Sequence, residues 1–410
     1  MNKKNIPFTK EQVASLATTP FYVYDKKAML DNASKFINAF SWAKGFKNFF
    51  AVKALPNPSI IKALNGIGMG CDCSSLTELM MAEKLGLSGN NIMFTSNNTP
   101  VEEFVKAKEL SAIINFDDIT HIKFYEENIG ELPETVCFRY NPGALKEGND
   151  IIGNPREAKY GLTLEQMFEA YEYVKSKGVK RLGLHTMVAS NETNADYFVE
   201  TAKIIFELAL RLKKEKNIQI DFINLGGGLG IPYFPYEKPL DIQEISDKIK
   251  AEYNALLKEN GLEPELYFEC GRYVTGPYGY LVTKAIHKKE TYKNYIGVDA
   301  CMVNLMRPAL YGAYHHISVM GKENEEHNYT YDVVGALCEN NDKFAIDRAL
   351  PKIENGDFLV ISDAGAHGSA MGFNYNGKLK CAEYFLNQDG SFEMIRRAET
   401  PDDYFATLNF

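Results

Sequence analysis

A lysine at the end of an apolar run is the first residue in this sequence that could carry out covalent chemistry. The run FFAV, residues 49–52, predicts a short buried strand, and Pro56 and Pro58 prevent that strand from continuing far beyond Lys53. We therefore expect Lys53 where a loop begins, at the mouth of the strand. One interpretation is an ordinary lysine whose ammonium group reaches water. The other is a partly desolvated amine, whose lowered pKa suits Schiff-base formation.

Two later stretches offer groups that could hold a charged cofactor. LGGGLGIPY contains Gly227 and Gly228, whose backbone amides could approach an anion because no side chains intervene, although a tight turn also explains the run. Its spacing does not match the dinucleotide-binding fingerprint. FECGRY places Glu269 at the end of an apolar run, where a buried carboxylate needs a partner, either a cationic ring nitrogen or Arg272. An amine, a phosphate-binding turn and a buried carboxylate together indicate pyridoxal phosphate.

Most of these residues follow predicted strands that alternate with amphipathic helical segments, such as LTELMMAEKLG and ADYFVETAKIIFELALRL. Several of the strands are apolar almost throughout, which is typical of parallel strands covered on both faces. The alternation predicts a (β/α)₈ TIM-like barrel, with a doubly wound open sheet as the alternative. The eight strands are expected at residues 47–52, 67–72, 91–95, 112–116, 135–140, 181–187, 219–225 and 266–270.

The active site of such a barrel lies at the carboxyl ends of its strands. The unusual residues of this chain gather at those predicted ends. They are Lys53 after the first strand, Asp72 after the second, His185 and Ser190 at the sixth, Gly227 and Gly228 after the seventh, and Glu269, Gly271 and Arg272 after the eighth.

After about residue 275 the pattern changes to short strand-like runs with few helical segments between them. The runs YGYLVTKAIHKKE, NYIGVDA, YTYDVVGAL, DFLVISDAG, KLKCAEYFLN and SFEMIRRAE predict a C-terminal antiparallel β-domain. The N-terminal TPFYVYD, residues 19–25, could pair with its sheet. We therefore expect the barrel at residues 28–278 and the β-domain at residues 1–27 and 279–410.

Composition excludes several classes of protein. The net charge of −9 and the absence of a basic stripe argue against a nucleic-acid partner. No apolar run approaches the roughly 18 residues of a membrane span, and the start MNKKNIPFTK predicts no secretory signal. Seven irregularly spaced cysteines indicate reduced thiols in a cytoplasm. Cys71 and Cys73 lack a second pair or a nearby histidine, so no metal site is expected.

Seven stretches resemble the diaminopimelate decarboxylase family, which belongs to the alanine-racemase-like, barrel-type pyridoxal-phosphate decarboxylases. The resemblance covers nearly the whole chain. Its lysine and glycine motifs are shared with ornithine and arginine decarboxylases, whereas RPALYGAYHHI and the pattern within CENNDKFAIDRALP are more specific to the diaminopimelate branch. The stretches are FFAVKALPNPSII, GCDCSSLTEL, LGGGLGIPY, FECGRYVTGPYG, MRPALYGAYHHI, GALCENNDKFAIDRALP and DAGAHGSAMGFNYNG.

The resemblance implies a role for each matching residue. Lys53 would form the imine with the cofactor, Glu269 would pair with the pyridine nitrogen, and Asp72 and His185 would belong to the cofactor site. The phosphate would lie among Ser190, Gly227, Gly228, Gly271, Arg272 and Tyr375.

The substrate's distal carboxylate and amino end would be held by Arg272, Arg307 and Tyr311, with Tyr375 nearby. In the family, a cysteine matching Cys338 protonates the carbanion, and a glutamate matching Glu339 recognises the distal ammonium. Both come from the neighbouring subunit, which implies a homodimer. Without the resemblance, a buried core thiol is the favoured interpretation of Cys338, and Arg307 could be a surface residue at the start of a turn.

The chain departs from the family pattern at three positions. The family usually has a histidine three residues before the serine, stacked on the cofactor ring, and Met187 stands there in this chain. Either its sulfur covers the ring, or His185, two residues earlier on the same strand face, reaches it. Cys270 replaces a common proline, and His367 replaces a usual aromatic residue.

The function that the resemblance implies is decarboxylation of meso-2,6-diaminopimelate to L-lysine and carbon dioxide, the last step of lysine biosynthesis. The alternatives are a decarboxylase of another basic amino acid or of carboxynorspermidine, an amino-acid racemase on the same barrel, and a non-catalytic homologue that binds pyridoxal phosphate. The presence of both Lys53 and Cys338 argues against the last.

Overall fold

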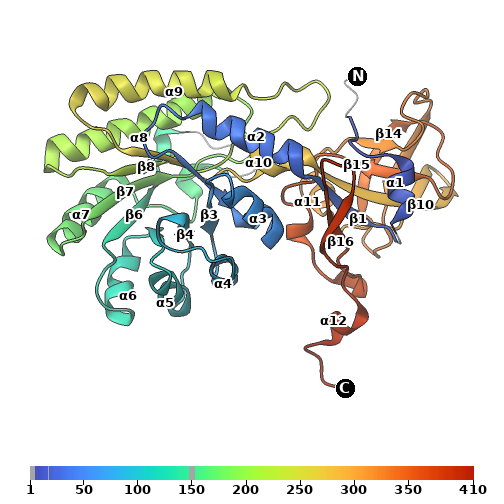
Figure 1. Ribbon diagram of the computed structural model, residues 1–410, viewed down its shortest axis with the longest axis horizontal. Helices are drawn as coiled ribbons and strands as arrows, with labels where there is room; N and C mark the ends of the chain where they lie inside the picture. The colour runs from blue at the N-terminus through green and yellow to red at the C-terminus, as the bar shows by residue number, and fades with distance from the viewer. Residues whose placement is uncertain (1–4, 17, 147–152) are drawn as a thin grey trace. The chain divides into compact units, whose positions relative to one another are not determined.

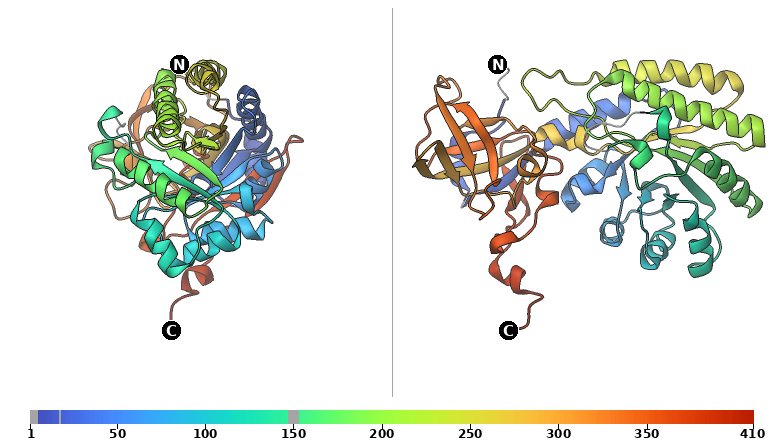
Figure 2. Two further views of the ribbon diagram at one scale, coloured as in Figure 1. Left: turned by 90° about the vertical axis from the view of Figure 1, so that its left-hand side faces the viewer. Right: turned by 180° about the vertical axis from the view of Figure 1, so that it is seen from behind.

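The structure is a computed structural model that describes residues 5–16, 18–146 and 153–410 (Figures 1 and 2). Two compact units make up the chain, and each is described here by itself. The barrel unit comprises Asn32–Ile231 and Pro239–Tyr273. The β-unit comprises the described residues up to Asp31, together with Pro232–Lys238 and Val274–Phe410.

Within the described residues, eight parallel strands of the barrel unit close into a barrel. Each strand pairs with the next along the chain, and the pairing of Lys47 with Tyr267 joins the first strand to the last. Eight strands and closure confirm the predicted (β/α)₈ class and exclude the open sheet. The strands are β2 (Lys47–Ala51), β3 (Gly70–Cys73), β4 (Ile92–Thr95), β5 (Ile113–Phe116), β6 (Thr135–Tyr140), β7 (Arg181–Thr186), β8 (Phe222–Asn224) and β9 (Glu265–Phe268).

The helices of this unit lie outside the barrel strands, as the views in Figure 2 show. The two longest, α8 and α9, run side by side in both figures. The helices are α2 (Lys26–Ala39), which begins in the β-unit, α3 (Pro58–Asn65), α4 (Leu76–Lys84), α5 (Val101–Glu109), α6 (Thr120–Asn128), α7 (Leu164–Ser176), α8 (Ala195–Lys216), α9 (Ile242–Leu256) and α10 (Arg272–Thr275), which ends in the β-unit.

The barrel interior is closed by large side chains from alternate positions of its strands. Phe49, Met93 and Ile113 are each at most 1% exposed, so this part of the barrel is a packed core and not a channel. Polar chemistry is thereby confined to the strand ends. The interior cluster consists of Phe49, Met93, Ile113, Cys137, Phe222 and Tyr267.

The chain after β2 shows why Lys53 occupies a tight turn. A single turn of 3₁₀-helix, Val52–Ala54, follows the strand directly and carries Lys53. Asn57 then caps α3 by accepting a hydrogen bond from the Ser59 backbone amide at 3.0 Å, and Pro58 takes the first helical position, where no amide proton is needed. The PNPS sequence therefore fixes Lys53 between a buried strand and a capped helix.

The β-unit is built on one mixed sheet with the order β14-β13-β11-β10-β1-β16-β17 among its described residues, and β12 and β15 attach beside β10. The N-terminal strand β1 lies between β10 and β16, which confirms that TPFYVYD pairs with the later sheet. The strands are β1 (Phe21–Asp25), β10 (Gly279–Glu290), β11 (Asn294–Val298), β12 (Ile317–Val319), β13 (Tyr329–Val334), β14 (Lys343–Leu350), β15 (Phe358–Ile361), β16 (Ala382–Leu386) and β17 (Phe392–Arg396).

Most strand pairings of this sheet are antiparallel, as expected, and two are parallel. The pairs β1–β16 and β11–β13 are parallel, and the other pairings are antiparallel. A parallel pair needs a long connection between its strands. The whole barrel and most of the β-unit separate β1 from β16, whereas residues 299–328 separate β11 from β13.

Three short helices complete the β-unit: α1 (Lys10–Ser15), α11 (Arg307–Tyr311) and α12 (Pro401–Phe405). The segment Pro232–Lys238 also belongs to this unit, although it follows the glycine run of the barrel directly in sequence. Among the described helices of the whole chain, none combines the length and the apolar composition that a membrane crossing demands.

Candidate active site

Lys53 faces a buried carboxylate at the end of the neighbouring strand. Its Nζ lies 3.4 Å from Oδ2 of Asp72, which is 1% exposed, whereas the Lys53 side chain is 53% exposed. Asp72 raises the pKa of Lys53, and this effect exceeds the opposite effect of desolvation. The expectation of a lowered lysine pKa was therefore wrong for the chain alone, because the sequence suggests desolvation but does not reveal the neighbouring charge.

Asp72 itself is strongly perturbed. Burial is the largest cause, and the negative charge of Glu269 adds to it, so the pKa of Asp72 lies well above its ordinary value despite the nearby Lys53 ammonium. Its Oδ1 is a buried oxygen without a hydrogen-bond partner among the described residues. A raised carboxyl pKa beside an exposed amine is typical of a catalytic site.

Glu269 is held at both carboxylate oxygens. Oε2 lies 3.0 Å from Nε2 of His185, and Oε1 accepts a hydrogen bond from Nδ2 of Asn224 at 2.8 Å. Asn224 Oδ1 in turn accepts from the Gly226 amide at 2.9 Å, which ties the carboxylate to the glycine turn. Burial acts to raise the pKa of Glu269, but the facing His185, with Lys53 and Arg139, outweighs burial and leaves this pKa below its ordinary value.

The glycine turn and the loop carrying Ser190 run beside each other. The Glu192 amide donates to the Gly228 carbonyl oxygen at 2.9 Å, and the Gly230 amide donates to the Glu192 carbonyl oxygen at 2.8 Å. Gly228 has φ +97°, and a Cβ there would lie 2.6 Å from the Ala189 carbonyl oxygen, so this approach requires glycine. The structure thus brings the neighbours of Ser190, Ala189 and Glu192, against the glycine turn.

The ECGR stretch packs against the turn that carries Lys53. A Cβ on Gly271 would lie 2.6 Å from the Ala54 side chain, so only glycine lets these backbones approach. Asn48 of β2 fixes the same stretch, because its side chain donates to the Cys270 carbonyl oxygen at 3.1 Å and accepts from the Cys270 amide at 2.8 Å. Arg272 follows immediately at the start of α10 and is 9% exposed.

Met187 and His185 have different surroundings. His185 lies within β7, is 1% exposed, and is engaged with Glu269. Met187 follows the strand, and its Sδ accepts a hydrogen bond from the Gly227 amide at 3.1 Å. His185 is therefore bound to the carboxylate, while Met187 lies on the glycine turn. Which of the two covers a cofactor ring stays a prediction.

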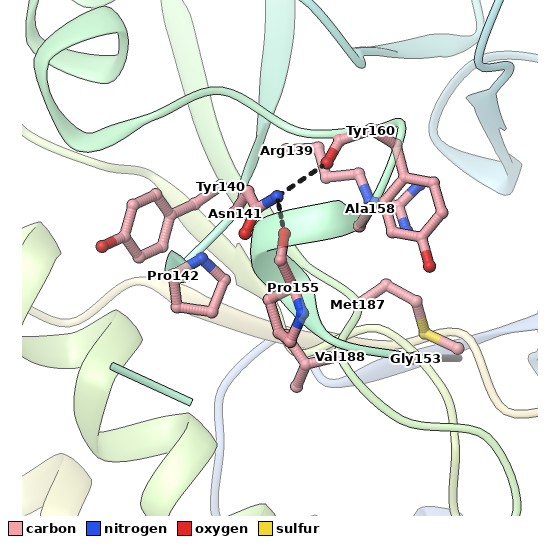
Figure 3. Close-up of a pocket in the computed structure, with 10 residues that line it drawn as sticks. All are labelled: Arg139, Tyr140, Asn141, Pro142, Gly153, Pro155, Ala158, Tyr160, Met187 and Val188. Carbon is pink, nitrogen blue, oxygen red and sulfur yellow. Dashed lines mark hydrogen bonds between the residues drawn. The ribbon is translucent and has the colours of Figure 1, made fainter. Parts of the chain in front are cut away.

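A pocket beside Met187 lies at the ends of β6 and β7 (Figure 3). The side-chain amide of Asn141 donates to the carbonyl oxygens of Pro155 and Tyr160, at 2.8 and 3.2 Å, and so holds the segment that forms its wall. The lining residues are Arg139, Tyr140, Asn141, Pro142, Gly153, Pro155, Ala158, Tyr160, Met187 and Val188.

Arg139 is a site residue that the sequence reasoning missed. It is the penultimate residue of β6, is 7% exposed, and donates from Nη1 to Asp117 at 3.2 Å. Its guanidinium also lies 3.8 Å from the centre of the Tyr160 ring. Arg139 adds positive charge near Lys53 and Glu269. The available signal was an arginine inside the apolar run TVCFRY, the same kind of anomaly that identified Lys53.

In the β-unit, three of the predicted residues meet. The Cys338 Sγ lies 3.2 Å from the Tyr375 hydroxyl, and that hydroxyl donates to Oε1 of Glu339 at 3.1 Å. Hydrogen bonding with Cys338, and then with Glu339, raises the pKa of Tyr375 to about 12. Cys338 and Glu339 are exposed and Tyr375 is 43% exposed, so the interpretation of Cys338 as a core thiol is excluded.

Arg307 and Tyr311 lie at the two ends of α11. Tyr311 is 57% exposed, whereas Arg307 is only 4% exposed, which excludes the interpretation of Arg307 as a surface residue. Arg307 donates from Nη1 to Nε2 of His315 at 2.8 Å. The β-unit therefore offers one exposed cluster and one buried arginine.

The barrel groups fit pyridoxal phosphate. Lys53 is an accessible amine, and Glu269 is a buried carboxylate that can face a cationic ring nitrogen. The turn beside them must be glycine, because a Cβ on Gly227 would lie 2.6 Å from the Glu269 carbonyl oxygen. A closed (β/α)₈ barrel with these groups at one end defines a pyridoxal-phosphate type of site.

Comparison with known proteins identifies the family to which the chain belongs. Residues 29–276 match the family model described as the pyridoxal-binding domain of pyridoxal-dependent decarboxylases. That match covers more than half of the chain. The chain therefore belongs to the pyridoxal-dependent decarboxylase family.

Individual proteins match this chain over nearly the whole length of both sequences. Protein TabA of Pseudomonas amygdali pv. tabaci is 40% identical over 98% of this chain and 93% of its own. The diaminopimelate decarboxylase of Methanothermobacter thermautotrophicus is 34% identical over 95% and 92%. The crystal structure of diaminopimelate decarboxylase from Helicobacter pylori complexed with L-lysine matches with a TM-score of 0.87 and 27% identity, covering 97% of this chain and 98% of that one.

Proposed function

We propose that this chain decarboxylates meso-2,6-diaminopimelate to L-lysine and carbon dioxide, with pyridoxal phosphate as cofactor, as the last step of lysine biosynthesis. The observation that carries the proposal is the buried Glu269–His185 pair, at the same end of the barrel as the accessible amine of Lys53. Relatives named diaminopimelate decarboxylase, similar over nearly their whole length, support the choice of substrate.

Pyridoxal phosphate, when bound, supplies a pyridine ring that accepts the electron pair released as carbon dioxide leaves. In this proposal Lys53 holds the cofactor through its amine. Glu269, kept ionised by His185, favours a proton on the ring nitrogen and so strengthens the ring as an electron acceptor. Asp72 stabilises the ammonium form of Lys53 whenever this amine is released from the cofactor.

The phosphate would be held by backbone amides of the glycine turn together with Ser190, Gly271, Arg272 and Tyr375. The segment 226–231 supports this role, because Gly228 and Gly230 are hydrogen-bonded to Glu192 and the Ile231 amide donates to Asn191. A preorganised backbone loses little conformational freedom when it binds an anion.

The substrate has a second amino-acid head that does not react, and its carboxylate calls for cations. Arg307 and Arg272 would bind that carboxylate, since the planar guanidinium group can donate two parallel hydrogen bonds to it. Tyr311 would contact the same end, and Glu339 would accept from the distal ammonium. Cys338 would return a proton to the reacting carbon, with the Tyr375 hydroxyl 3.2 Å from its sulfur.

We also propose a homodimer in which Cys338 and Glu339 complete the partner's barrel site, in a cytoplasmic setting. The exposure of the Cys338–Glu339–Tyr375 cluster supports the first part. The second part is supported by the cysteines, because all seven are free and none needs an oxidising compartment.

A carbon dioxide release assay on purified, cofactor-loaded protein tests the substrate. The panel is meso-diaminopimelate, ornithine, arginine, lysine and carboxynorspermidine, because one similar protein, TabA, carries a name that states no substrate. We expect release from diaminopimelate alone, with L-lysine as the amino-acid product. Release confined to another substrate would replace the proposal by a different decarboxylase, and inversion of a stereocentre without release, seen by chiral chromatography, would replace it by a racemase.

A further inference from the structure

A buried histidine in the β-unit accepts a hydrogen bond from Arg307. His315 is fully buried, and its Nε2 lies 2.8 Å from Nη1 of Arg307. Its Nδ1 lies 2.9 Å from the carbonyl oxygen of Ser362. A carbonyl oxygen can only accept, so Nδ1 carries the ring proton and Nε2 presents a lone pair to the guanidinium. The contact therefore requires a neutral imidazole of one defined tautomer.

His315 and Arg307 are further fixed by aromatic packing. The Tyr233 ring centre lies 4.4 Å from the Arg307 guanidinium carbon and 5.2 Å from the His315 ring centre, with the two rings edge to face. Tyr233 belongs to the segment Pro232–Lys238, which packs in the β-unit. The guanidinium is thus held by a ring face and by an imidazole nitrogen.

A second arginine, Arg348, binds the backbone of His315. Arg348 of β14 donates from Nη1 to the His315 carbonyl oxygen at 2.9 Å, and its guanidinium lies 4.0 Å from the centre of the Tyr314 ring. Tyr314 stacks in turn on Phe234, with ring centres 4.7 Å apart. His315 is therefore fixed by its side chain and by its main chain.

We propose that His315 is a positioning residue, which orients Arg307 to bind the carboxylate that the diaminopimelate substrate and the lysine product have in common. The proposal rests on the function given above. Its physical basis is geometric: the imidazole nitrogen fixes Nη1 of Arg307 and the Tyr233 ring packs against the guanidinium, so the planar group is held from two directions. Arg307 then meets a ligand carboxylate in a fixed orientation.

Comparing the binding of two ligands to the holoenzyme distinguishes a loss of Arg307 orientation from a general disruption of the binding site. L-lysine keeps the distal carboxylate, and cadaverine has the same chain and amines without it. By titration calorimetry we expect His315→Leu to weaken lysine binding about tenfold, the equivalent of one lost charged hydrogen bond, and to change cadaverine binding less than twofold. His315→Gln, which restores an acceptor, should recover most of the lysine affinity. His327→Leu, the same change on an exposed loop, is the matched control.

A double-mutant cycle tests whether His315 acts through Arg307. If it does, His315→Leu has no further effect on lysine binding once Arg307 is alanine. Equal weakening of lysine and cadaverine, or additive effects in the cycle, would overturn the proposal. Failure of the proposed function is seen separately, because the wild-type holoenzyme would then release no carbon dioxide from diaminopimelate and would not prefer lysine to cadaverine.

Discussion

The two groups of candidate site residues differ in how the chain holds them. In the barrel unit, Asp72, His185 and Glu269 are at most 8% exposed and lie in strands or at a strand end, and His185 and Glu269 contact each other. In the β-unit, Cys338, Glu339 and Tyr375 are exposed, and Cys338 and Glu339 are bonded to the tyrosine hydroxyl between them. The barrel cluster is buried and hydrogen-bonded within its own unit, whereas the β-unit cluster is exposed on the surface. A buried network can tune pKa values within one chain, whereas exposed groups suit delivery to a second chain.

The largest expected effect is a loss of turnover, and it tests the difference between the two clusters most directly. Lys53→Ala and Cys338→Ala should each lower turnover on the order of a thousandfold, but only Lys53→Ala should remove the visible absorbance of the lysine-bound cofactor. If the exposed cluster serves the partner's barrel, mixing the two inactive variants under exchange conditions restores roughly a quarter of the wild-type activity, through one intact site per mixed dimer. No recovery, in a mixture shown to exchange subunits, would mean that each chain uses its own cysteine.

A smaller effect concerns what each cluster contributes to stability. Asn224→Leu leaves a buried oxygen of Glu269 without its donor, so we expect a loss of about 1–3 kcal/mol in the free energy of unfolding, measured by urea denaturation. Tyr375→Phe removes a hydroxyl from the exposed cluster and should leave this free energy unchanged while slowing turnover. Equal losses of stability in both variants would remove the distinction between the two regions.

The smallest effect is a pair of opposite pH dependences within the barrel cluster, measured as unfolding free energy in cofactor-free protein. The folded pKa of Glu269 is lowered, so its stabilising contribution is present above an unfolded pKa of about 4.3 and is lost as the pH falls through the folded pKa. The advantage of wild type over Glu269→Gln should therefore shrink in acid.

Asp72 should show the reverse. Its folded pKa is raised, so wild type should lose stability relative to Asp72→Asn as the pH rises above about 3.9. Slopes of the same sign for the two pairs would contradict the assigned pKa directions.

The sequence predicted the barrel well because its signal is local. Each strand is an apolar run bounded by turn residues, and a charge at the end of such a run identified Lys53 and Glu269. The contacts that tune these residues are not local: His185 and Glu269 lie 84 positions apart, and Asn224 lies 45 from Glu269. A single sequence carries no record of such pairs.

The same limitation explains what the sequence reasoning missed in each unit. Asn48 and Asn224 are ordinary polar residues until the structure shows their buried partners. His315 was visible only as part of the YHHI stretch, and its contact with Tyr233 depends on a segment that follows the glycine run of the barrel. The interpretation of Lys53 as an amine with a lowered pKa was wrong for the same reason. An apolar run indicates that a residue is buried, but it does not indicate which charge lies beside it.

The central place of β1 in its sheet has a consequence for synthesis on the ribosome. Val23 pairs with Tyr280 on one side and with Tyr384 on the other, so both neighbours are translated long after β1 itself. The strand is almost entirely buried when folded, and its aromatic, β-prone FYVYD segment has no sheet to join while the barrel is being made. A nascent chain must therefore keep this segment from aggregating until almost the last residues emerge, which makes it the natural point of chaperone dependence in this protein.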